Sequence, residues 1–124
     1  MIDTMVYVRN VWRMGQHCVR VIFKYGHEDW EPHFELEEVL MAAVEQSGKG
    51  EFDGNEIAMD NSTCEYFMDG PNADDLFAVV RPILEASSIV VEGVATLRYG
   101  GIDEDAREAV ILVGRRPGDQ TLPS

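Results

Sequence analysis

The sequence predicts an α+β domain in which two helices cover one face of an antiparallel sheet. Two segments carry apolar residues at the spacing of an amphipathic helix, and six shorter runs are rich in β-branched and aromatic residues. In chain order the predicted elements are β, β, α, β, β, α, β, β. With 124 residues and 45% apolar content, the chain is large enough for a domain with its own core. We expect one domain over residues 1–114 and a flexible C-terminal tail over residues 115–124.

The first two predicted strands lie near the start of the chain. Met5–Arg9 is rich in β-forming residues, and Cys18–Tyr25 alternates so that its odd-numbered apolar residues share one face. Gly15 lies between the two segments and could close a hairpin. These segments therefore predict a pair of strands before the first helix.

The clearest predicted helix spans Phe34–Ser47. Its apolar stripe consists of Leu36, Val39, Leu40, Ala43 and Val44. The opposite face carries three acids, which are Glu35, Glu38 and Glu45. Pro32 suits the first turn of a helix, and Gly48 suits a C-terminal cap. This pattern predicts a helix with one buried face and one acidic face.

The next two predicted strands, Glu51–Met59 and Cys64–Asp69, are joined by the turn-forming run Asp60–Thr63. Gly54 interrupts the first of them. Because glycine adopts positive φ without steric cost, we expect either a bulge or a tight turn there.

The second predicted helix begins after Asn72, a suitable N-cap, with Asp75 in the first turn. Its apolar stripe consists of Leu76, Val79, Val80, Ile83 and Leu84. Pro82 lies inside this pattern and removes one backbone hydrogen bond, so we expect a bent helix with the proline facing solvent.

Val94–Tyr99 and Arg107–Val113 are the last two predicted strands. Without the outermost strands the order is βαββαβ, the split β-α-β order of a ferredoxin-like sandwich. The predicted fold is therefore ferredoxin-like with an additional N-terminal and C-terminal strand. Those strands could extend the sheet at its edges. Alternatively, an edge strand could pair with a second copy of the chain and form a homodimer.

The negative charge is concentrated in the middle of the chain. The net charge is −13, and residues 28–75 contribute −14, from fifteen acids against the single base Lys49. A field of this sign repels phosphate, so we expect no nucleic-acid and no membrane partner, whereas a basic protein would be attracted. The simpler interpretation is an acidic surface that only maintains solubility.

No segment has the length and apolarity of a membrane span, and Met1–Thr4 lacks the features of a secretory signal. We therefore expect a cytoplasmic protein. In a reducing cytoplasm Cys18 and Cys64 are expected to be buried free thiols, with a disulfide or a reactive thiol as the alternatives.

Sequence motifs give little support for catalysis or for a cofactor. His17, His27 and His33 lack the spacing of a zinc site, so we expect surface histidines. The acids of the predicted hairpin, which are Glu51, Asp53, Glu56 and Asp60, do not match a calcium-binding loop and indicate a solvated edge. Because neither a nucleophile motif nor a phosphate-binding loop is present, we assign no catalytic residue, metal or cofactor, and a non-enzymatic protein is the favoured interpretation.

Residues Gly50–Gly100 include the segments GEFDGNEIAMD, MDGPNADDLFAVVRPILEAS and TLRYG, and they resemble a group of small bacterial proteins to which we attach no activity. The resemblance covers under half of the chain. In size, acidity and α+β character the chain is also similar to immunity proteins, which neutralise secreted bacterial toxins, many of them basic nucleases. This second resemblance implies a protein inhibitor with a basic partner.

The leading hypothesis is an acidic protein-binding domain that grips a basic protein. The candidate partner-binding residues are Trp30, Glu35, Glu38, Met41, Glu45, Glu51, Asp53 and Glu56. The alternative is a small-molecule sensor or enzyme with its ligand between the sheet and the helices or at a dimer interface.

Overall fold

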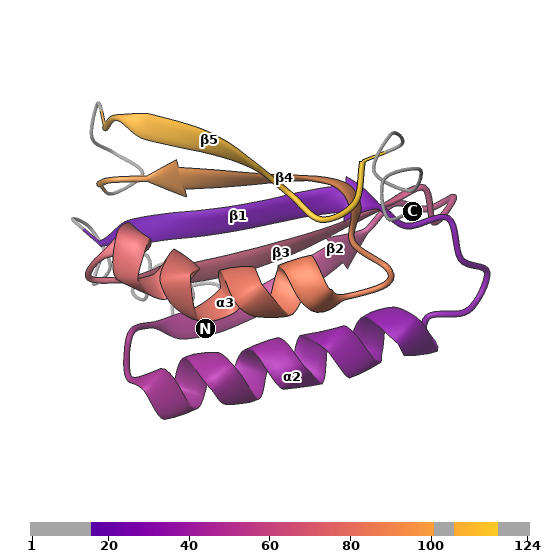
Figure 1. Ribbon diagram of the computed structural model, residues 1–124, viewed down its shortest axis with the longest axis horizontal. Helices are drawn as coiled ribbons and strands as arrows, with labels where there is room; N and C mark the ends of the chain where they lie inside the picture. Colours follow the sequence, from indigo (N-terminus) through magenta and orange to yellow (C-terminus); the bar gives the residue numbers. More distant parts are fainter. Residues whose placement is uncertain (1–15, 101–105, 117–124) are drawn as a thin grey trace, which may run out of the picture.

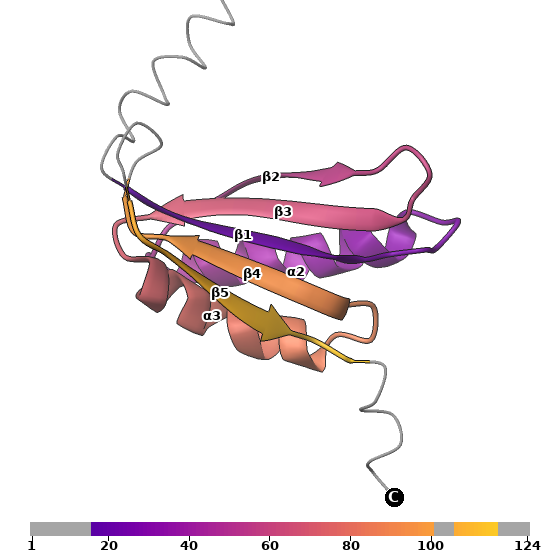
Figure 2. The same ribbon diagram turned by 90° about the horizontal axis from the view of Figure 1, so that it is seen from above.

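The computed structural model describes residues 16–100 and 106–116. In chain order its elements are β1 (His17–Lys24), α2 (Glu31–Ser47), β2 (Glu51–Ile57), β3 (Thr63–Gly70), α3 (Ala73–Ala86), β4 (Val91–Arg98) and β5 (Glu108–Val113). The five strands form one antiparallel sheet in the order β2-β3-β1-β4-β5. Both helices lie on the same face of this sheet, and no described helix covers the other face (Figures 1 and 2).

The predicted α+β class, with two helices on one face of an antiparallel sheet, is confirmed in the described part of the chain. The sheet does not match a plain ferredoxin-like sandwich in its strand count and overall order, because β5 adds a strand beyond β4. The predicted strand Met5–Arg9 lies outside the described residues.

The core lies between the helices and the central strand β1. Val19 lies opposite Met68 on β3 and Leu97 on β4, and Val21 lies opposite Tyr66 and Ala95 in the same way. All six side chains are buried. The alternation predicted for the first described strand therefore produces one apolar face, and buried side chains from the helices pack onto it.

The interruption at Gly54 is a bulge, which is one of the two forms that the sequence predicted. The pairing of β2 with β3 shifts between Phe52 and Gly54, and Gly54 has a φ of 148°. The shift places Glu56 opposite Glu65, on the same face of the sheet as Glu51. The acids of β2 therefore lie on the face away from the helices.

Helix α2 begins at Glu31, three residues before the predicted start, with Pro32 in its first turn. It ends at Ser47, and the left-handed backbone of Gly48 and its N–H bond to the Glu45 carbonyl confirm the predicted cap. Because the helix starts early, Trp30 and Phe34 are separated by one helical turn.

Helix α3 begins as predicted, since the Asn72 side chain accepts a hydrogen bond from the Asp75 N–H at 3.0 Å. Pro82 lies inside the helix and is exposed. After β5, the Arg115 N–H donates to the Val90 carbonyl at 3.0 Å. The rest of the predicted tail, residues 117–124, lies outside the described residues.

Candidate functional site

The exposed side of α2 carries acids from its first turn to its last turn. Its exposed acids are Glu31, Glu35, Glu38 and Glu45, and the helix has no lysine or arginine. Leu36, Leu40 and Val44 anchor the opposite face in the core, which fixes the direction of the acids. Among the described residues, Glu35, Glu38 and Glu45 take part in no ion pair. The surface therefore presents uncompensated negative charge to solvent.

Two aromatic side chains interrupt this acidic face at the start of α2. The rings of Trp30 and Phe34 meet edge to face, with centroids 6.3 Å apart, and the residues are 51% and 46% exposed. They line a shallow hollow of about 510 Å³, which we call the acidic notch. Its lining residues are Asp29, Trp30, Glu31, Phe34, Glu35 and Glu38. Four carboxylates thus surround an exposed aromatic pair.

Hydrogen bonds hold the loop that forms the notch. The Trp30 indole N–H donates to the Asn61 side-chain oxygen at 3.3 Å, and the Asn61 amide donates to the His27 carbonyl at 2.9 Å. The Tyr25 hydroxyl donates to the Asp29 carbonyl at 2.5 Å. The turn between β2 and β3 therefore supports Trp30, although the two lie 31 positions apart in the sequence.

His33 lies in the core beneath the notch, so the predicted surface position is wrong for this histidine. The early start of α2 turns it inward, and it is fully buried. Its Nδ1 lies 3.8 Å from Cys64 Sγ, and its Nε2 has no hydrogen-bond partner among the described residues. Burial lowers the pKa of His33, against an opposing effect of Glu37, and raises the pKa of Cys64 to about 11. A neutral imidazole beside a protonated thiol is not an activated nucleophile pair.

The other histidines and the cysteines have ordinary structural surroundings. His27 is exposed, whereas His17 is partly buried and its Nδ1 accepts the Ala73 N–H at 2.9 Å, at the start of α3. Cys64 is a buried free thiol, as predicted, whereas Cys18 is only partly buried.

The pKa of His33 makes stability depend on pH. Because the folded-state pKa is lower than the ordinary value of 6.5, the unfolded chain binds more protons between these two values. The contribution of His33 to the free energy of unfolding is therefore fully present above pH 6.5. It is lost as the pH falls through 6.5 toward the folded-state pKa. We expect urea denaturation to show a smaller loss on acidification for His33→Leu than for the parent chain. Equal losses in the two proteins would contradict this prediction.

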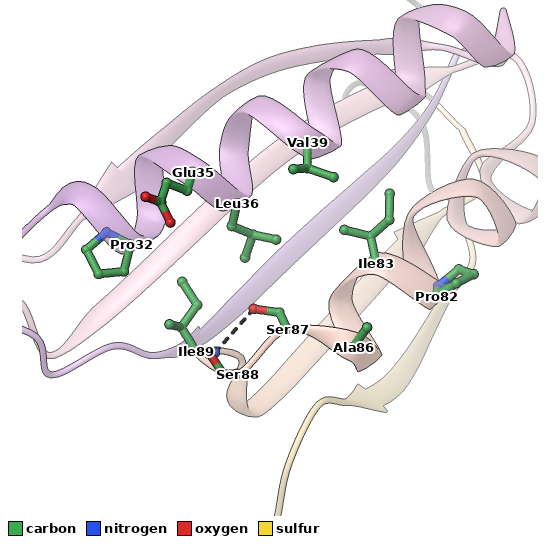
Figure 3. Close-up of a pocket in the computed structure, with 10 residues that line it drawn as sticks. All are labelled: Pro32, Glu35, Leu36, Val39, Pro82, Ile83, Ala86, Ser87, Ser88 and Ile89. Atoms are coloured by element: carbon green, nitrogen blue, oxygen red, sulfur yellow. Dashed lines mark hydrogen bonds between the residues drawn. The ribbon is translucent and has the colours of Figure 1, made fainter.

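A second depression lies between α2 and α3, next to the notch (Figure 3). It is an open groove of about 540 Å³, lined mainly by apolar side chains. The residues that line it are Pro32, Glu35, Leu36, Val39, Pro82, Ile83, Ala86, Ser87, Ser88 and Ile89. The Ile89 N–H donates to the Ser87 hydroxyl at 3.2 Å and orders the end of α3. Glu35 lines both depressions, so the groove and the notch adjoin.

The eight predicted partner-binding residues do not form one surface. Trp30, Glu35 and Glu38 line the notch, while Met41 and Glu45 line a smaller hollow of about 310 Å³ that extends from the other end of α2 to the start of β2 at Glu51. Asp53 lies at the bulge, with its carboxylate within 4.8 Å of those of Glu51 and Asp69, and Glu56 faces away from the helices.

The notch also contains residues that the sequence analysis did not select: Asp29, Glu31 and Phe34. The signal for Phe34 was present, because Pro32 in the first turn places the helix start early enough to bring Trp30 and Phe34 one turn apart.

No described helix is long and apolar enough to cross a membrane. Comparison with protein-family models, with curated proteins and with solved structures finds no match to this chain.

Proposed function

We propose that this chain is a protein-binding domain that grips a basic segment of a partner protein with the acidic notch of α2. The observation that carries the proposal is the exposed Trp30–Phe34 pair surrounded by the carboxylates of Asp29, Glu31, Glu35 and Glu38. A guanidinium or ammonium group is attracted both to an aromatic face and to carboxylates. The same site would repel an acidic partner.

The adjoining groove supports a partner segment that also carries an apolar side chain. Leu36, Ile83 and Ile89 point into the space between the helices, and Glu35 separates this space from the notch (Figure 3). An apolar residue in the groove followed by a base in the notch would combine hydrophobic burial with charge pairing. The partner segment is therefore proposed to be both apolar and basic.

The finer assignment is an immunity-type inhibitor of a basic bacterial toxin, acting as a cytoplasmic protein. Small size, a net charge of −13 and the similarity in character to immunity proteins support it.

We also propose that the fold is a ferredoxin-like sandwich to which β5 has been added. The elements from β1 to β4 follow the βαββαβ order of that fold.

Charge reversal tests the proposed function. The probe is a short peptide of leucine and arginine, and the control peptide carries glutamate in place of arginine. Glu38→Lys is expected to weaken binding of the basic peptide about tenfold, as measured by titration calorimetry, because a charge in the notch changes sign. Glu56→Lys changes the net charge equally on the helix-free face and is expected to leave the affinity within about twofold of the parent. Equal effects of the two substitutions, or equal binding of the two peptides, would refute a specific acidic site.

The second candidate function is binding of a small apolar molecule, and the groove between α2 and α3 favours it. The interior between the sheet and the helices is filled by buried side chains, so the groove is the better place for such a ligand in the described structure. Nile red, a neutral apolar dye, distinguishes the two functions. Dye fluorescence that is strong in the parent chain and absent in Val39→Glu would favour the small-molecule function.

A further inference from the structure

The two edges of the sheet differ in how well they are protected against pairing with another strand. Strand β2 carries the bulge at Gly54 and three acids, Glu51, Asp53 and Glu56, all of which disfavour further pairing. Strand β5 pairs with β4 in unbroken register from Glu108 to Val113 and has the sequence EAVILV. Within the described residues, β5 is thus a regular, apolar edge with a charge only at its first position.

The backbone of β5 has hydrogen-bonding groups directed outward. The Tyr99 N–H donates to the Arg107 carbonyl at 2.9 Å, next to the pair Arg98 and Glu108. Bonding toward a neighbour alternates along an antiparallel strand, so the odd-numbered residues of β5 bond toward β4. The N–H and C=O groups of Val110 and Leu112 are therefore directed to the open edge.

The side chains of the same two residues are exposed on the helix-free face, at 64% for Val110 and 61% for Leu112. Leu112 lies beside Val94, which in turn lies beside Ile22 on β1. An apolar row thus crosses three strands and ends at the edge. A second strand placed against β5 would extend this row and cover its exposed end.

The charge distribution favours a second copy of the chain as the occupant of this edge. The acids of β2 and α2 lie at the far side of the molecule from β5 (Figure 1). Charges separated by more than about 8 Å are largely screened at physiological ionic strength. Two copies joined through β5 would therefore keep their acidic surfaces apart, whereas joining through β2 would bring them together.

We propose that β5 pairs antiparallel with β5 of a second copy, about a twofold axis near Ile111, so that the two sheets become one. In this register Val110 lies opposite Leu112 of the second copy, and Ala109 lies opposite its Val113, so that apolar residues meet on both faces. A twofold axis perpendicular to the sheet keeps all helices on one face. Both acidic notches then remain uncovered. The proposed dimer does not depend on what the notches bind.

The mass of the full chain in solution tests the proposed dimer. Light scattering after size exclusion is expected to give about twice the monomer mass of 13.9 kDa at micromolar concentration. Leu112→Lys is expected to raise the dimer dissociation constant at least about tenfold, because lysine at the edge opposes pairing. Met59→Lys, which places the same charge at a fully exposed residue of the β2–β3 turn, is expected to leave the dimer unchanged.

Amide exchange locates the interface independently of the substitutions. The N–H groups of Val110 and Leu112 are expected to exchange at least about tenfold more slowly at high than at low protein concentration. A full chain that remains monomeric would overturn the proposal. Slow exchange at β5 at every protein concentration would also overturn it, because another part of the same chain would then cover the edge. A dimer that is insensitive to Leu112→Lys would also overturn it.

Discussion

Replacing Tyr66 with alanine is expected to lower the free energy of unfolding by about 3–5 kcal/mol, a large part of the stability of a domain of this size. Tyr66 is fully buried on β3, and its ring centroid lies 5.7 Å from that of Phe23 and 5.5 Å from that of Phe52. Its hydroxyl donates to the His33 carbonyl at 3.1 Å and ties the first turn of α2 to the sheet. Alanine removes both the packing and this bond, and urea denaturation measures the loss.

The conservative variant separates the two contributions. Tyr66→Phe keeps the ring and is expected to cost about 1–3 kcal/mol, because the hydrogen bond is lost and the buried His33 carbonyl loses a donor. Equal losses for the alanine and phenylalanine variants would contradict the assigned role of the ring in filling the core.

Replacing Trp30 with alanine is expected to weaken binding of the leucine and arginine peptide by about 30-fold or more, the size of effect seen at an aromatic hot spot. Trp30 forms the aromatic wall of the notch with Phe34 and is supported by its bond to Asn61. The residue is half exposed, so its removal leaves a smaller cavity than removal of a core residue would. Calorimetric titration of the folded variant gives the affinity directly.

Two further variants make the Trp30 result specific. Trp30→Phe keeps an aromatic face and is expected to retain most of the affinity. Met59→Ala removes a fully exposed apolar side chain outside the notch and is expected to leave the affinity unchanged. If Trp30→Ala bound as tightly as the parent chain, the notch would not be the binding site.

Features that depend on neighbouring residues could be predicted from the sequence. The apolar stripe that buries Leu36, Leu40 and Val44, the caps at Gly48 and Asn72, and the bulge at Gly54 all follow from local preferences. The order of the seven described elements was also correct, because turn-forming residues separate the segments that have helix or strand patterns.

Features that depend on pairing between distant segments could not be predicted. Whether Glu51 and Glu56 share a surface with the acids of α2 depends on the register of β2 against β3, and the bulge reverses the face of Glu56. The burial of His33 follows from the position at which α2 begins, and helix boundaries are the least certain part of a sequence pattern. The concentration of charge in residues 28–75 was visible in the sequence, but its division between two faces of the molecule was not.

The two proposed surfaces are compatible with one another. Pairing through β5 would leave two notches on the same side of a joined sheet, so one partner with two basic segments could bind both at once. Binding by a single notch does not require the dimer, since every residue that lines it comes from one chain.

The central claim is that the acidic notch binds a basic segment, and amide chemical-shift mapping of the full chain tests it most directly. Titration with the leucine and arginine peptide is expected to move the Trp30 indole signal and the amides of Asp29, Phe34, Glu35 and Glu38 most strongly. The amides of β2 around Asp53 and Glu56 should move much less, because they lie at the bulge and on the helix-free face. Shifts that centre on β2, or that are spread evenly over all acidic residues, would contradict the claim.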